Sequence, residues 1–170
     1  MKALDTLSPV MKSLFLTTLF SGRRIGECRS MQWADIDLDA GIWTIPDTKS
    51  GEPQVCVIPL VLIDILNDRK TDSESDWVFP AKSKTGHVVA VNNSWSKVRK
   101  HGFEHLRVND LRGTLASWLQ EAGVPIIGAS QQLGHGSVDV TARHYSSISN
   151  QVQRIGLDSA TNAMIEAAAE

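Results

Sequence analysis

The chain has 170 residues, of which 42% are hydrophobic, and a formal net charge of −2 at pH 7. This length and composition predict one compact domain with its own hydrophobic core. The near balance of charge, taken alone, argues against a polyanionic partner. The apolar run at residues 14–20 is too short for a transmembrane helix and has no signal-type cleavage site. The sequence therefore predicts neither a membrane span nor a targeting signal.

The first half of the chain predicts helices and a small sheet. Ser8 followed by Pro9 is typical of a helix start, and Gly22 of a helix end. A polar surface loop is expected at 70–76 before the chain returns to the core at 77–80. The expected elements are a helix at 9–21, a helix at 24–33, strands at 42–45 and 55–58 joined by a turn at 49–53, and a helix at 60–69.

The second half is expected to be almost entirely helical. Asn92 or Asn93 is a candidate cap for one helix, and Gly123 and Gly134 are candidate helix ends. The expected elements are a short strand at 87–91, helices at 92–101, 110–122 and 125–133, a short helix that leads to residue 145, and a helix at 158–168. The predicted fold class is α+β, mostly helical, with a small antiparallel β-sheet.

Positive charge is concentrated in residues 82–112, where seven basic residues face only Glu104 and Asp110. A basic face on an acidic body is compatible with phosphate binding, although a solvated helix face is the commoner cause of such a run. The basic residues of this stretch are Lys82, Lys84, Lys97, Arg99, Lys100, Arg107 and Arg112.

Two segments place an arginine at the start of a helix. Arg24 lies in SGRRIGE, three residues before Glu27, and Arg112 lies in NDLRGT. A guanidinium donates two parallel hydrogen bonds to a phosphate and keeps its charge, and a helix N-terminus also favours an anion. The ordinary alternatives are a surface pair of Arg24 with Glu27, and a solvated Arg112 in a helix that Asn109 caps.

The chain contains one tyrosine, Tyr145, which follows His135 by ten residues. His135 comes directly after Leu133 and Gly134. A histidine after a helix-ending glycine is more often a capping or surface group, and a lone tyrosine is more often a core residue with a hydrated hydroxyl. Each segment alone is therefore weak evidence for a site.

Together and in this order, four segments resemble the tyrosine recombinases, the phage integrase family, over nearly the whole chain. The first arginine box of that family is similar to SGRRIGECRSMQWADID, and its lysine-bearing β-hairpin to TKSGEPQVCVIPL. The second arginine box is similar to NDLRGTLASWLQEAGVPI, and the Leu-Gly-His turn with the nucleophile segment to QLGHGSVDVTARHYS. The resemblance implies the catalytic-domain fold of these DNA breaking-rejoining enzymes.

The resemblance also implies a role for each matching position. Arg24 and Arg112 would hold the non-bridging oxygens of the scissile phosphate, and His135 would add a hydrogen bond to it. Tyr145 would attack the phosphorus and leave a 3′-phosphotyrosyl link, while Lys49 would protonate the leaving 5′ oxygen. No metal, nucleotide or other cofactor is implied, because the covalent link conserves the energy of the phosphodiester.

Two further positions of the arginine boxes have implied roles. Glu27 would orient its neighbours without touching DNA. The family usually has histidine where this chain has Asn109, which can donate a hydrogen bond to phosphate but cannot titrate near neutral pH. We expect Asn109 to slow the chemistry while leaving DNA binding intact. His144, beside the nucleophile, and His105 are the alternative bases that could take the proton of Tyr145.

The lysine assignment and a metal site have their own alternatives. Lys84 also lies in a Lys-Thr-Gly turn, but the strand pair that flanks Lys49 is missing there, so we favour Lys49. His101 and His105 have a spacing that fits zinc, but Gly102 weakens the helix between them and no third ligand is near, so we expect no metal site. The isolated Cys28 and Cys56 are interpreted as buried, reduced thiols of a cytosolic protein.

We expect residues 1–170 to form a single catalytic domain, without the N-terminal core-binding domain that family members usually carry. Residues 150–170 are a candidate tail for docking on a neighbouring protomer, or else an ordinary terminal helix. The implied partners are double-stranded DNA, further copies of the chain in a tetramer on DNA, and accessory DNA-bending proteins, in the cytoplasm at the nucleoid. The DNA-binding candidates are Lys82, Lys84, Lys97, Arg99, Lys100, Arg107 and Arg143.

The resemblance implies a site-specific DNA recombinase or integrase that cuts and rejoins DNA strands. Two other functions stay open. One is a DNA-binding remnant or accessory protein that keeps the fold and has lost catalysis through Asn109. The other is a strand-relaxing topoisomerase of the related tyrosine type, resembling type IB.

Overall fold

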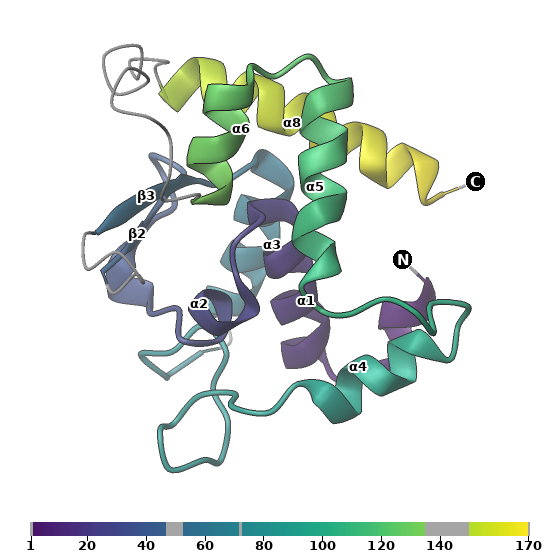
Figure 1. The fold of residues 1–170 in the computed structure, drawn as a ribbon. Helices are drawn as coiled ribbons and strands as arrows, with labels where there is room; N and C mark the ends of the chain where they lie inside the picture. Colours follow the sequence, from purple (N-terminus) through teal and green to yellow (C-terminus); the bar gives the residue numbers. More distant parts are fainter. Residues whose placement is uncertain (1, 47–52, 72, 135–149, 170) are drawn as a thin grey trace.

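The computed structural model describes residues 2–46, 53–71, 73–134 and 150–169 (Figure 1). Within these ranges helices dominate, and the strands form one three-stranded antiparallel sheet. The expected mostly helical α+β class with a small antiparallel sheet is confirmed. The elements are η1 (Lys2–Thr6), α1 (Pro9–Ser21), α2 (Ile25–Arg29), η2 (Trp33–Asp35), β1 (Ile36–Asp37), β2 (Ile42–Ile45), β3 (Gln54–Val57), α3 (Leu60–Thr71), α4 (Asn92–Arg99), α5 (Asp110–Glu121), α6 (Ile126–Leu133) and α8 (Asn150–Ala167).

Helix α1 runs through the middle of the fold and supplies much of the core (Figure 1). The side chain of Ser8 caps its first turn, and Gly22 ends it with a φ of 67°, as the sequence predicts. Phe15 is buried and meets Trp95 of α4 edge to face, with ring centroids 5.1 Å apart. Because α1 contacts α2, α3 and α5, the turn at its C-terminal end lies where several elements meet.

Strand β2 is the middle strand of the sheet and pairs antiparallel with β1 and β3. Opposite Trp43 of β2 lie Ile36 on one side and Cys56 on the other. The antiparallel pairing of β2 with β3 is confirmed, although β3 begins at Gln54 instead of residue 55, and residues 49–52 of the expected turn lie outside the described residues. Strand β1 was not expected, because its two residues are too few to show an alternating pattern.

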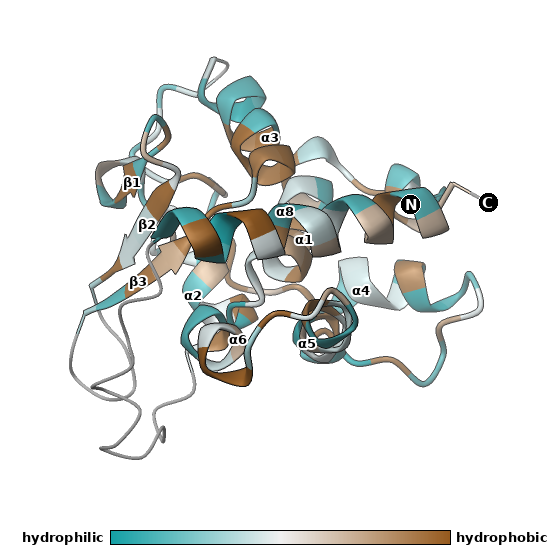
Figure 2. Cartoon of the chain, turned by 90° about the horizontal axis from the view of Figure 1, so that it is seen from above, coloured by the Kyte–Doolittle hydropathy of each residue, from teal (hydrophilic) through white to brown (hydrophobic). Residues whose placement is uncertain are grey.

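Helix α5 contacts both α1 and α8, while α6 contacts α5 and β3. Figure 2, turned from the first view, shows α5 and α6 side by side. Leu115 and Leu119 of α5 and Leu157 of α8 are buried in this layer. The expected helix ends at Gly123 and Gly134 are confirmed by their positive φ angles.

Helix α8 begins at Asn150, well before the expected start at residue 158. Polar contacts connect its first half to the turn before β2 and to the start of α3, and a helical hydrophobic pattern does not reveal such contacts. Nη2 of Arg154 donates to the carbonyl oxygen of Gly41 at 2.8 Å, and Oδ1 of Asp158 accepts from the backbone N–H of Leu60 at 2.8 Å. No helix in the described ranges is long and apolar enough to cross a membrane.

The expected helix at residues 24–33 is too long, because α2 ends at Arg29. Beyond that point the chain pairs with a distant segment instead of continuing the helix. The N–H of Trp33 donates to the carbonyl of Asp76, and the N–H of Val78 donates to the carbonyl of Met31, both at 3.0 Å. These tertiary hydrogen bonds compete successfully with the local helical pattern.

The strand expected at residues 87–91 is also wrong. Only a single bridge between Pro80 and His87 forms there, with the N–H of Val88 bonded to the carbonyl of Phe79. The cap expected for α4 is wrong as well, since Val91 precedes the helix and no side chain caps it.

Candidate active site

The turn between α1 and α2 carries two adjacent arginines in opposite environments. Gly22 turns the chain with a positive φ, which costs glycine little. Arg23 then points into the protein and is 1% exposed. Arg24 follows in an extended conformation, with ψ of 142° and a side chain that is 47% exposed. The turn thus buries one guanidinium and presents the next one to solvent.

Glu27 holds the exposed Arg24. Its Oε1 accepts from Nη1 of Arg24 at 3.0 Å, and its Oε2 accepts from the backbone N–H of Arg24 at 3.1 Å. This contact is the i,i+3 pair expected for an ordinary Arg-x-x-Glu. The other guanidinium nitrogens of Arg24 donate to no residue in the described part of the chain, so the group can bind an anion while Glu27 orients it.

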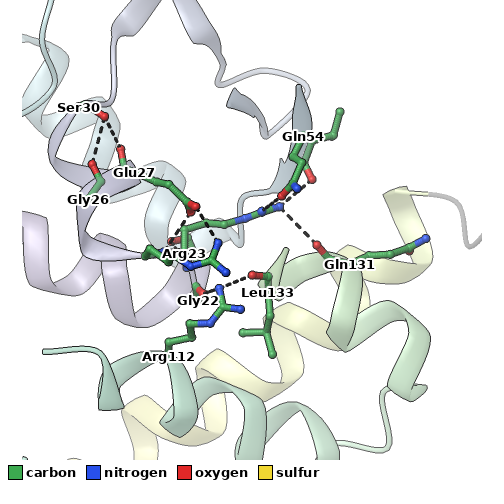
Figure 3. Close-up of polar contacts among 12 residues, drawn as sticks. Gly22, Arg23, Gly26, Glu27, Ser30, Gln54, Arg112, Gln131 and Leu133 are labelled. Carbon is green, nitrogen blue, oxygen red and sulfur yellow. Dashed lines mark hydrogen bonds and ion pairs between the residues drawn. The ribbon is translucent and has the colours of Figure 1, made fainter. Parts of the chain in front are cut away.

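Arg112 reaches the same turn from the first turn of α5. Its Nη1 donates to the carbonyl oxygen of Gly22 at 3.1 Å and to the carbonyl oxygen of Leu133 at the end of α6. Figure 3 shows the guanidinium between these two carbonyls. Burial, followed by the nearby charge of Arg24, lowers the pKa of Arg112. The group stays a cation, because the ordinary pKa of arginine is far above neutral pH.

Arg24 and Arg112 line one open pocket of about 370 Å³. Arg107 and Asp110 lie on its wall and pair with each other, with 3.2 Å between Nη2 and Oδ1. The backbone N–H of Arg107, and then its guanidinium, hold the pKa of Asp110 below its ordinary value. Three guanidinium groups and one carboxylate therefore line a pocket whose charge suits a phosphate. The lining residues are Arg24, Arg107, Asn109, Asp110, Arg112, Gly113, Ala116 and Leu133.

Asn109 is exposed at the wall of this pocket, immediately before α5. Asn109 occupies the N-cap position of α5, as the alternative interpretation expects, but its side chain makes no capping hydrogen bond. The amide makes no hydrogen bond to a described residue and is available to a ligand in the pocket. Its effect on chemistry stays a prediction.

The other basic candidates that the structure describes do not line the pocket. Lys97, Arg99 and Lys100 are exposed at the end of α4, where Nε of Arg99 donates to the carbonyl of Glu104 at 2.7 Å. Lys82 and Lys84 are exposed in a loop that hydrogen bonds between residues 81 and 86 close, outside the three-stranded sheet. Of the described DNA-binding candidates, only Arg107 lies beside Arg24 and Arg112.

Four of the expected site residues lie outside the described residues: Lys49, His135, Arg143 and Tyr145. The alternative base His144 lies there too. The structure describes the strands before and after the Lys49 segment, and it describes Gly134 directly before His135. The positions of these side chains relative to the pocket stay predictions.

Two buried polar residues behind the pocket, Arg23 and Gln132, were not among the predicted site residues. Arg23 donates to β3 and to the end of α6. Gln132 is 1% exposed, and its Nε2 donates to the carbonyl oxygens of Ser21 at 3.0 Å and Val57 at 2.9 Å. Both residues join the end of α1 to β3 and α6. A polar side chain in an apolar helix face was the available signal for Gln132, whereas no local signal separates Arg23 from Arg24.

The potential metal ligands of the described residues are scattered, and no three of His, Cys, Asp or Glu gather to hold a metal ion there. Cys28 and Cys56 are free and buried, as expected. Burial raises the pKa of the Cys28 thiol to about 12 and also raises that of Cys56. Both side chains therefore stay neutral thiols within the core.

Comparison with known proteins identifies relatives of this chain. Residues 1–151 match the family model described as the phage integrase family. The chain is 27% identical over 147 residues to the prophage integrase IntF of Escherichia coli K12, which covers 81% of this chain and 31% of that protein.

Two solved structures share the fold. The integrase of mycobacterium phage Brujita matches with a TM-score of 0.74 at 18% identity, over 93% of this chain and 54% of that one. The XerH site-specific recombinase bound to its difH substrate matches with a TM-score of 0.65 at 18% identity, over 88% and 48%. The expected tyrosine-recombinase catalytic-domain fold is confirmed. The chain spans 31% to 54% of the length of these three proteins. Since the family match covers residues 1–151, the chain belongs to the phage integrase family.

Proposed function

We propose that this chain is the catalytic domain of a site-specific DNA recombinase or integrase. The observation that carries the proposal is the convergence of Arg24 and Arg112, from α1–α2 and α5, on one open cationic pocket. Leu133 forms part of the pocket wall, and in the sequence Gly134 and His135 follow it directly. The geometry supports a phosphate bound beside the point where the nucleophile segment begins.

In the proposed reaction the Tyr145 hydroxyl gives its proton to solvent or to the alternative base His144, and its oxygen attacks the scissile phosphorus. The new bond joins that oxygen to phosphorus and leaves a 3′-phosphotyrosyl link. The bond from phosphorus to the 5′ oxygen breaks, and Lys49 gives that oxygen a proton. Attack by a 5′-hydroxyl of the partner strand reverses these steps and rejoins DNA, so neither metal nor ATP takes part.

The cationic pocket supports the charge stabilisation that this reaction needs. Phosphoryl transfer depends mainly on positioning and on neutralising the oxygens of the transition state. Arg24 and Arg112 would bind those oxygens, with His135 as a third donor, while Glu27 orients Arg24. The tyrosine hydroxyl has an ordinary pKa of about 10, and a cationic pocket favours its phenolate.

The proposed substrate is duplex DNA; the XerH site-specific recombinase, which has a similar fold, is bound to its difH substrate. The exposed basic residues of α4 and of the loop at residues 81–86 would bind backbone phosphates outside the pocket, which makes binding sensitive to salt. Recombination between two sites implies a tetramer on DNA, assisted by DNA-bending proteins. The tail at residues 150–170 packs on α5 and α3 of its own chain through α8, and its docking on a neighbour stays a prediction.

The test is covalent trapping on nicked duplexes. A labelled pool with random sequence around the nick is incubated with the protein and resolved on a denaturing gel. Release of the short fragment beside the nick prevents rejoining, so a cut strand stays attached to the protein. We expect an adduct from the wild-type chain and none from Tyr145→Phe. Sequencing of the trapped strands would give the preferred site.

Asn109 supports a second candidate, a DNA-binding protein of this fold with impaired catalysis. Duplex binding without any adduct would favour this candidate, and an adduct gained by Asn109→His would locate the defect at that position. Relaxation of supercoiled plasmid without sequence preference would instead favour a topoisomerase.

A further inference from the structure

Arg23 is the only charged residue among the fully buried side chains of the described chain. Its Nη1 donates to Oε1 of Gln54 at 2.8 Å. Its Nη2 donates to the carbonyl oxygens of Val55 at 2.9 Å and Gln131 at 3.4 Å. One guanidinium therefore joins the start of β3 to the last turn of α6 (Figure 3), and Arg24 is the next residue of the chain.

The residues around Arg23 leave space for its planar, forked guanidinium group. A Cβ atom at Gly134 would lie 2.2 Å from Nη1 of Arg23 and 2.6 Å from Oε1 of Gln54. The absence of a side chain at Gly134 therefore gives the guanidinium its room. The backbone N–H of Arg23 donates to Oγ of Ser21 at 3.2 Å, which fixes the residue at the end of α1 as well.

The charge of Arg23 has no carboxylate partner in the described structure. All its acceptors there are neutral, and its buried Nε has none among the described residues. Burying a cation without an opposite charge costs stability, and an apolar side chain of similar volume often fills such a position without loss. The arginine is therefore not explained by packing.

We infer that Arg23 is a positioning residue for the cleavage reaction. Its fork holds β3 and the end of α6 at a fixed distance behind Arg24. The segment with Lys49 enters β3 at Gln54, and the segment with His135 leaves α6 at Gly134. Arg23 thus fixes the point where the segment with the proton donor Lys49 joins β3. It also fixes the point where the segment with the third phosphate ligand, His135, leaves α6. This inference rests on the proposed function.

The test compares two leaving groups in the trapping assay, on the duplex selected from the pool. In one substrate the 5′ bridging oxygen of the scissile phosphate is replaced by sulfur. A thiol has a pKa of about 8.5, so its thiolate leaves without a proton from an acid. Arg23→Met should cleave the oxygen substrate about 100-fold more slowly than wild type, since misplacement of a catalytic group by about 1 Å has this effect. With the sulfur substrate it should recover most of the lost rate.

Two other variants separate the effect of the guanidinium geometry from the effects of positive charge and of folding stability. Arg23→Lys keeps the charge without the fork and should resemble Arg23→Met. Gln54→Met removes one acceptor and should show the same selective defect to a smaller extent, even if Arg23→Met fails to fold. Arg69→Met is the matched control, because Arg69 also donates to a backbone carbonyl, that of Val78, but away from the pocket. Its ratio of rates on the two substrates should equal that of wild type.

The outcomes distinguish this inference from the proposed function. An adduct from wild type with an unchanged rate ratio in Arg23→Met and Gln54→Met would overturn the inference alone. Full rescue by Arg23→Lys would do the same, because charge and not the fork would then matter. No adduct from wild type on any duplex would overturn both.

Discussion

The two sides of helix α5 show how this domain separates chemistry from stability. At its first turn Arg112 binds the carbonyl oxygens of Gly22 and Leu133 and faces an open cationic pocket. Further along, Leu115 and Leu119 are buried, and Trp118 borders an apolar pocket of about 280 Å³ between α1, α4 and α8. The polar side is held by a few directional hydrogen bonds to backbone, and the apolar side by many nondirectional contacts.

The difference between the two sides implies that they respond differently to substitution. Loss of one hydrogen bond at the polar side displaces a charged group and affects catalysis out of proportion to stability. Loss of one methyl group at the apolar side costs contacts in the core but leaves the proposed phosphate ligands in place. Four substitutions or titrations can break or sharpen this contrast.

The largest change in stability is expected at the apolar side. Leu119 is 1% exposed, so Leu119→Ala should lower the free energy of unfolding by about 2–5 kcal/mol through lost burial and a residual cavity. Urea denaturation measures this loss. Ile126→Ala, at a side chain that is 84% exposed, is the control and should change little. The rate of adduct formation per folded molecule should stay at the wild-type value. A large fall in that rate would show that packing at the apolar side also determines the geometry of the pocket.

The converse effect is expected for Arg112→Lys at the polar side. Lysine keeps the charge but loses the planar fork, and removal of one preorganised donor typically slows such reactions about 100- to 1000-fold. Single-turnover adduct formation with excess protein measures the rate. Arg24→Lys should slow cleavage similarly but reduce stability less, since among the described residues Arg24 is bonded only to Glu27 whereas Arg112 joins two elements. Unchanged cleavage in both variants would contradict the role of the pocket.

Gly134→Ala should affect both stability and cleavage. Gly134 follows Leu133, which lines the cationic pocket, and it lies against the buried guanidinium of Arg23. Its φ of 67° is unfavourable for alanine, and the new methyl group would meet Arg23. We expect a loss of about 1–3 kcal/mol in unfolding free energy, together with slower cleavage. Gly26→Ala is the matched control, since a Cβ there meets nothing within 4 Å. Wild-type stability in Gly134→Ala would show that the turn relaxes easily.

Local signals in the sequence predicted the elements that local chemistry determines. Ser8 and Gly22 gave the bounds of α1, and the hairpin strands and the arginine boxes were recognisable from their residues. The burial of Arg23 was not predictable, because its acceptors lie 31 to 108 positions away in the chain. Asn109 had the residue type of a helix cap, yet its side chain caps nothing. Tertiary contacts decided both cases.

The smallest effect per group, the pH dependence that each buried thiol gives to stability, tests whether the core behind the pocket is as dry as the apolar side of α5. Cys28 and Cys56 are buried there, and burial raises both pKa values, that of Cys28 to about 12. A raised pKa in the folded state means that folding favours the protonated thiol. The resulting stability is complete below the unfolded pKa, near 9.0, and is lost as pH rises from there toward 12. Each thiol should contribute a decline of at most about 1.4 kcal/mol per pH unit in this window.

Urea denaturation between pH 8 and 10.5 measures this decline, with Cys28→Ala/Cys56→Ala as the control that retains every other titrating group. The decline above pH 9 should be steeper in wild type than in the double variant. Equal slopes would mean that water reaches the thiols in the folded state, so that their pKa values are not raised. The Gly22 turn, which Ser21 and Gln132 connect to these thiols, would then be hydrated from behind. In that case the directional hydrogen bonds of the polar side would have to hold Arg112 in place without a dry support.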